Sequence, residues 1–186
     1  ATLANWAKPS MFDRVDGRYR GQRNKSDDYV KEKLGASIPD LVANGTGEIR
    51  TTAIQAVASL NLTAATDQLA GLLKSDRDPA IRAIALTSLD KLGAPGLEAY
   101  LRTALNDQDN SVRSRALSLL PESSVDPADA TKLYTDIIKT GSTPDAQAAL
   151  TGLVALESPY ADVLLTSLMD QLVIGELPAP IRPDHT

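Results

Sequence analysis

The sequence predicts an all-α fold, a right-handed α-solenoid of about four to five helix pairs that follows an extended N-terminal strap. The first observation is a duplication: residues 76–89 are matched by residues 107–120, 31 positions later. The second is composition, since Ala, Leu, Val and Ile supply the apolar residues and only 4% are aromatic, which favours closely packed helices. The third is the lack of alternating β-branched and aromatic runs. Repeats of this length typify solenoids, whose units bury their apolar faces against their neighbours.

Each repeat is interpreted as two helices joined by an Asp-containing loop. After the loop, Ile81, Ala85 and Leu89 recur at i, i+4 and i+8, which places them on one face of the second helix. A shorter echo at residues 49–57 marks the preceding unit. The first helix of each pair carries a leucine at 32-residue intervals: Leu41, Leu73 and Leu105.

Three regions follow from the pattern along the chain. Residues 1–26 contain the turn signals Lys8-Pro9-Ser10 and Asp16-Gly17 and no helical stripe, so they are assigned to the strap. Residues 27–174 are assigned to the solenoid, which opens with an N-cap at Ser26. Residues 175–186 are assigned to a C-terminal loop or truncated boundary, because a glycine and three prolines interrupt them.

The last two units diverge from the repeat. The fourth pair is expected to bury Leu133 and Ile137 on its first helix, and Gln147 falls roughly where the arginine of the second helix would be. Its second helix is expected to pack through Ala148, Leu150, Leu153 and Val154. The final helix, from about Pro159 to Val173, is expected to bury one apolar stripe: Ala161, Leu164, Leu165, Leu168 and Leu172.

Charge is distributed unevenly. The chain has a net charge of −5, yet residues 1–26 hold six basic and two acidic residues, so the strap carries +4 and the remainder −9. An acidic body lacks the basic surface that binds a polyanion, which argues against nucleic acid as the main ligand. No apolar run of 18 residues is present, so no membrane span is expected.

The sequence predicts no catalytic residue, cofactor or metal site. There is no cysteine, and His185 is the single histidine, which alone forms neither a triad nor a three-ligand zinc site. No serine lies in a G-x-S-x-G motif. The chain is therefore not expected to be an enzyme.

The pattern D-x-x-[IV]-R-x-x-A-[LI], in units of 31–32 residues, resembles the short bacterial type of HEAT repeat over roughly residues 36–174. This resemblance implies a ladder in which the loop aspartate of one unit pairs with the arginine of a neighbour. The residues implied in that ladder are Asp78, Arg82, Asp109, Arg113 and Arg50.

The charged residues of the repeat allow other interpretations. The arginines could form an anion-binding row, but the acidic loops offer them partners within the chain. The pairs Asp76/Asp78 and Asp107/Asp109 could serve metal or acid–base chemistry, but each precedes a helix, where N-capping is the ordinary role. We favour the structural interpretation for both sets.

The strap has a narrower resemblance, carried by Asn5-Trp6-Ala7-Lys8-Pro9, Asp13-Arg14-Val15 and Gly17-Arg18-Tyr19-Arg20. These segments resemble exported multidomain proteins of planctomycete and Bacteroidetes type, which join a sugar-dehydrogenase-like β-propeller, a HEAT region and a cytochrome c domain. The resemblance implies a periplasmic or exported location, although a cytoplasmic one stays open. No propeller or haem motif is present here, so no redox function transfers.

The strap is also the best candidate interaction surface. Aromatic residues mixed with arginines are enriched at interfaces and on nucleic-acid platforms. The strap could dock on its own helices, contact an adjoining domain or bind nucleic acid. The residues concerned are Trp6, Phe12, Arg14, Arg18, Tyr19 and Arg20.

The function predicted is a non-catalytic protein-interaction or spacer module, part of a larger exported redox protein. Its partners would be proteins, either adjoining domains or other subunits, which meet groove residues such as Gln55, Thr87 and Ser118. A HEAT-like DNA glycosylase or nucleic-acid-binding protein is an alternative that the acidic body disfavours. A cytosolic adaptor or a bilin-lyase-like partner is a further alternative.

Overall fold

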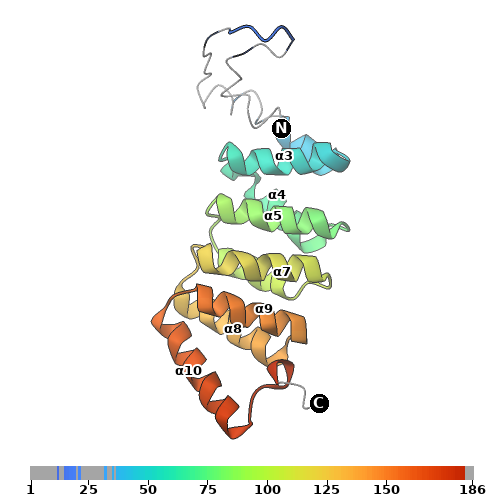
Figure 1. The fold of residues 1–186 in the computed structure, drawn as a ribbon. Coiled ribbons are helices and arrows are strands. Elements are labelled where there is room, and N and C mark those ends of the chain that lie inside the picture. The colour runs from blue at the N-terminus through green and yellow to red at the C-terminus, as the bar shows by residue number, and fades with distance from the viewer. Residues whose placement is uncertain are drawn as a thin grey trace.

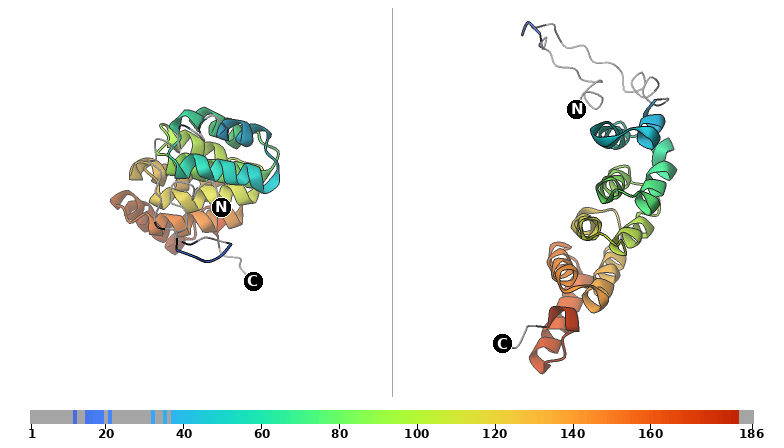
Figure 2. Two further views of the ribbon diagram at one scale, coloured as in Figure 1. Left: turned by 90° about the horizontal axis from the view of Figure 1, so that it is seen from above. Right: turned by 90° about the vertical axis from the view of Figure 1, so that its right-hand side faces the viewer.

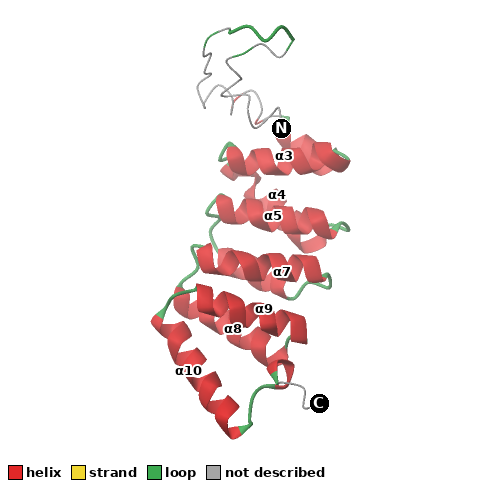
Figure 3. Ribbon diagram, viewed as in Figure 1, coloured by secondary structure: helices red, strands yellow, loops and turns green. Residues whose placement is uncertain are grey.

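The computed structural model describes residues 12, 15–19, 21, 32, 35 and 37–182, and residues 37–182 form a stack of antiparallel helix pairs (Figures 1 and 3). The first helices of the pairs are α2 (Ile38–Asn44), α4 (Thr66–Ser75), α6 (Leu97–Leu105) and α8 (Pro127–Thr140). The second helices are α3 (Gly47–Ser59), α5 (Pro79–Lys91), α7 (Asn110–Leu119) and α9 (Thr143–Ala155). A last helix, α10 (Pro159–Ile174), and three short 3₁₀ turns complete the described elements: Thr63–Ala65, Leu120–Glu122 and Ala179–Ile181.

The pairs form two columns, one of first helices and one of second helices (Figure 2). The stack bends so that the second helices lie on the inner side of the curve. Ile81, Ala85 and Leu89 are buried, as the repeat predicts. The all-α solenoid is therefore confirmed, and its core is a continuous apolar seam between the two columns.

Helix starts follow the local chemistry of the loops. Asp78 accepts a hydrogen bond from the backbone of Ala80, and Asp109 accepts one from the backbone of Ser111. Pro79 follows the first of these caps at a position where its missing N–H costs nothing. N-capping was predicted for the pairs Asp76/Asp78 and Asp107/Asp109, and it is confirmed for the second aspartate of each pair.

The fourth pair buries a different set of residues from the one predicted. Ala148 and Leu150 are only half-buried and Val154 is exposed, whereas Leu153 is buried as expected. The reason is register: α9 begins at Thr143, so its buried face runs through Ala146, Ala149 and Leu153. The alanine that occupies the position of Ala85 and Ala116 is thus Ala149.

The predicted C-terminal loop contains a short element of its own. The 3₁₀ turn Ala179–Ile181 packs against α8 and α9, and Leu177 ahead of it is buried. In the strap, Phe12 and Tyr19 form an isolated antiparallel bridge with their rings edge to face at 5.7 Å. The helix expected after Ser26 lies largely outside the described residues.

Candidate functional site

Three ion pairs connect the second helices α3, α5 and α7 each with the unit that follows. Arg50 donates through Nη2 to Asp76 at 2.5 Å, and Arg82 donates through Nη2 and Nε to both carboxylate oxygens of Asp107 at 2.6 and 2.7 Å. Arg113 donates through Nε to Asp145 at 3.0 Å. We call these three pairs the ladder. Each pair ties one repeat to the next across the stacking interface.

The arginines also hold the loops of their own units. Nη1 of Arg82 donates to the carbonyl of Asp76 at 2.8 Å, and Nη1 of Arg113 donates to the carbonyl of Asp107 at 3.0 Å. Arg50 makes a comparable bond from Nε to the carbonyl of Val42. A single guanidinium therefore fixes two consecutive loops, a use that suits its planar fork of donors.

The prediction from the family resemblance that Asp78 and Asp109 pair with the arginines is wrong. Asp78 and Asp109 cap helices and do not reach an arginine, whereas Asp76 and Asp107 form the ladder. The first aspartate of each pair is held toward the arginine because it accepts the backbone N–H of the second, at 2.9 Å in one loop and 2.8 Å in the other. In each loop, therefore, the first aspartate pairs with the arginine, and the second orients the first and caps the following helix.

The ladder ends in the fourth pair. Arg82 and Arg113 are each the fourth residue of their helices, and the fourth residue of α9 is the buried Ala146, one position before the expected Gln147. The last carboxylate comes from a non-equivalent position, because Asp145 lies inside the first turn of α9. Ser142 orients it through a hydrogen bond of 2.6 Å.

Pairing shifts the titration of the central ion pair. The hydrogen bonds from Arg82 lower the pKa of Asp107 below its ordinary value, and the same contacts raise the pKa of Arg82. The side chains are 13% and 10% exposed, so the pair is largely shielded from water. Asp107 is therefore a stable carboxylate and a poor candidate for acid–base chemistry.

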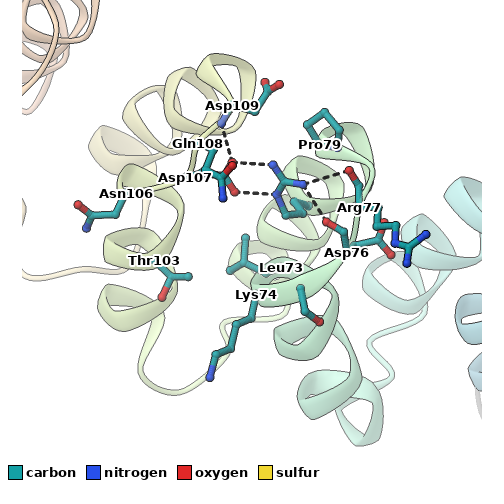
Figure 4. Close-up of a pocket in the computed structure, with 12 residues that line it drawn as sticks. Leu73, Lys74, Asp76, Arg77, Pro79, Thr103, Asn106, Asp107, Gln108 and Asp109 are labelled. Atoms are coloured by element: carbon teal, nitrogen blue, oxygen red, sulfur yellow. Dashed lines mark hydrogen bonds and ion pairs between the residues drawn. The ribbon is translucent and has the colours of Figure 1, made fainter.

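The central pair forms the floor of a surface depression of about 760 Å³ (Figure 4). Three carboxylates and three cations line it, so the depression has no excess of either charge: Asp76, Asp107, Asp109, Lys74, Arg77 and Arg82. Figure 4 shows that the bonds at Asp107 run across the depression rather than into open space. The arrangement is a structural joint, and its paired arginine is not available for an anion.

A second hollow, of about 490 Å³, lies along the second helices α3, α5 and α7. We call it the inner groove. Gln55 and Thr87 line it, as predicted, whereas Ser118 is exposed on α7 and donates to the carbonyl of Arg115. The remaining lining combines small apolar surface with two cations: Ala58, Ser59, Ala83, Ile84, Ser88, Lys91 and Arg115.

Sequence reasoning missed Arg115, which is the residue that organises the inner groove. Its Nε donates to Oγ1 of Thr87 at 2.9 Å, and Thr87 in turn donates to the carbonyl of Ala83. Burial raises the pKa of the nearby Asp90 despite the opposing charge of Arg115. The groove therefore presents a positioned guanidinium beside an apolar floor.

The strap residues are only partly placed. Phe12, Arg18 and Tyr19 are exposed, and the backbone N–H of Arg18 donates to Asp16 at 2.9 Å. Trp6, Arg14 and Arg20 lie outside the described residues.

A family model of HEAT repeats matches residues 38–121 and 67–169. The chain belongs to the HEAT-repeat family, whose members generally mediate protein interactions or act as scaffolds. No curated protein and no solved structure matches the chain significantly. Within the part of the chain that the structure describes, no helix is long and apolar enough to cross a membrane and no three acidic, histidine or cysteine side chains gather as a metal site would require.

Proposed function

We propose that this chain is a non-catalytic protein-interaction module and that the inner groove binds a polypeptide segment of its partner. The observation that carries this proposal is the difference between the two hollows. In the ladder depression the central Arg82 and Asp107 are already paired with each other, whereas the inner groove exposes Gln55, Lys91 and Arg115 along stacked helices. Stacked repeats commonly use such extended concave surfaces for binding.

The lining of the groove suggests the chemistry of the segment. Ala83 and Ile84 offer a small apolar floor, and the amide of Gln55 offers hydrogen bonds to a peptide backbone. Arg115 and Lys91 flank that floor, and a carboxylate on the segment would complement them. The segment proposed is therefore extended, with small apolar residues and at least one acidic side chain.

Site-specific photo-cross-linking tests this assignment. A photoreactive residue at position 55 reports on the groove, and one at the exposed Thr103 of α6 reports on the outer column. We expect partner adducts from position 55 that disappear when Arg115→Glu is added. Equal adducts from both positions, or adducts indifferent to Arg115→Glu, would contradict the proposal.

We further propose that the module is a spacer within a larger exported redox protein, in which the adjoining domains are its partners. The support is the resemblance of the strap segments around Trp6, Arg14 and Tyr19. Cross-linking against propeller and cytochrome c domains of the parent chain tests the spacer role, and a failure to contact any of them would remove it. Tight, salt-sensitive DNA binding in a gel shift would instead favour the nucleic-acid alternative.

A further inference from the structure

The outer surface of α10, the last α-helix among the described residues, is apolar. The helix packs on α8 and α9 through residues such as Ala161 and Leu168 and runs obliquely to the rest of the stack (Figure 1). Away from that contact, Val163 is 72% exposed, Met169 61%, Val173 84% and Ile174 66%. Exposed apolar side chains gathered on one helix are typical of an interaction surface.

The charge around this surface has one sign. Between residues 140 and 181 the sequence contains no lysine or arginine. Apart from Asp145, which pairs with Arg113, the carboxylates of this stretch are exposed and form no ion pair with the described residues: Glu157, Asp162, Asp170 and Glu176. The apolar surface of α10 is therefore framed by unpaired negative charge, and we call the two together the acidic end.

The opposite end of the chain has the complementary chemistry. The strap, residues 1–26, carries a net +4 and three aromatic residues. Among its described residues, Tyr19 is 64% exposed, Phe12 is 54% exposed, and the side chain of Arg18 is 80% exposed. Aromatic residues flanked by arginines suit a surface that is both apolar and acidic.

We propose that the strap of one copy docks on the acidic end of a second copy, so that the chains associate head to tail. The strap precedes α2 in the sequence, and α10 lies at the opposite end of the stack from α2 (Figure 1). A contact between two α10 helices would instead bring four carboxylates of one copy against the same four of the other, and like charges repel. The contact joins two different surfaces, so a dimer keeps one free strap and one free acidic end, and further copies can add to form open chains or closed rings. The proposal goes beyond the groove and stands independently of it.

The test uses charge reversals in the full chain. One variant combines Arg18→Glu with Arg20→Glu in the strap, and the other combines Asp170→Arg with Glu176→Arg at the acidic end. Sedimentation velocity at low salt should show concentration-dependent association of the wild-type chain. We expect each variant alone to associate at least tenfold more weakly. An equimolar mixture of the two variants should regain association, because the intact strap meets the intact acidic end and the reversed strap meets the reversed acidic end.

The controls separate this contact from folding and from general charge. Glu48→Arg with Asp67→Arg reverses two exposed carboxylates outside the acidic end and should leave association unchanged. Combining both reversals in one chain should restore association, and Val173→Asp with Ile174→Asp should abolish it with the helical circular dichroism retained. A wild-type chain that stays monomeric, or a strap variant that still associates, would overturn the proposal, the latter in favour of an α10–α10 dimer.

Discussion

The ladder and the acidic end differ in where their contacts are completed. In the ladder, Arg82 pairs with both oxygens of Asp107 and with a backbone carbonyl, so its donors are used inside the molecule. At the acidic end, Asp170 and Val173 are exposed to solvent. The difference teaches that a charged motif in fixed register can be structural, while charged and apolar side chains stay exposed where the repeat pattern stops.

The transition between the two regions occurs in the fourth pair. Ala146 replaces the arginine there, so α9 has no guanidinium to offer to a following loop. α10 then packs obliquely in place of another repeat and leaves its apolar outer surface uncovered. The predictions below act on this pair, on the ladder and on α10.

The largest effect is expected from Gly152→Ala, which disrupts the pair on which α10 rests. A Cβ at residue 152 would lie 2.4 Å from Oη of Tyr134, and that tyrosine is fully buried with its hydroxyl donating to the carbonyl of Leu117 at 3.2 Å. Overpacking together with loss of that hydrogen bond should reduce the free energy of unfolding by about 3 kcal/mol, measured by urea denaturation.

Gly71→Ala provides the matched control for that substitution. Gly71 is an exposed residue inside α4, and no atom lies within 4 Å of its Cβ position. Alanine should therefore stabilise the chain by up to about 1 kcal/mol through helix propensity alone. An equal loss of stability at both glycines would contradict the close contact at Tyr134.

The next effect is the loss of folding stability at low pH. The hydrogen bonds from Arg82 lower the pKa of Asp107, whereas an aspartate in the unfolded chain titrates near 3.9. The unfolded chain thus binds the proton first, so the stability from this pair is fully present above about pH 4 and is lost as pH falls through the lowered pKa. We expect urea denaturation across this range to show a shallower loss of stability for Asp107→Asn than for the wild type. If the free energy of unfolding had the same pH dependence in both chains, the lowered pKa of Asp107 would not contribute to stability.

The smallest effect on stability is expected on α10. Val173 is 84% exposed, so Val173→Ser removes little buried surface and should change the free energy of unfolding by less than about 0.5 kcal/mol. A buried reference, Leu153→Ala in α9, should cost about 2–4 kcal/mol. A similar cost at both positions would mean that the outer face of α10 is covered within the chain.

The sequence was sufficient for the architecture and for the caps. The spacing of Ile81, Ala85 and Leu89 predicted a buried helical stripe, and an aspartate directly before a helix predicted an N-cap at Asp78. These features depend on neighbours a few residues away, which is why local pattern determines them.

The partners of the arginines could not be predicted with the same certainty. The choice between Asp76 and Asp78 depends on an Asx-type hydrogen bond that turns the first carboxylate inward, and no helical periodicity records that turn. Asp145 lies outside the repeat pattern, although Ser142-x-x-Asp145 has the form of a capping box. Arg115 was missed because its partner Thr87 is 28 positions away, on a different repeat.

A double-mutant cycle on Arg82 and Asp107 tests most directly that the ladder is structural. The cycle combines Arg82→Met and Asp107→Asn. A second cycle on the exposed pair Arg102–Asp136, in which Nη1 and Oδ2 lie 3.8 Å apart, serves as the reference. For charge-assisted hydrogen bonds in a shielded pair we expect a coupling of about 1.5–3 kcal/mol in urea unfolding, against about 0–0.5 kcal/mol for the reference. A coupling near zero for Arg82 and Asp107 would contradict the account, because the arginine would then be free to bind a ligand.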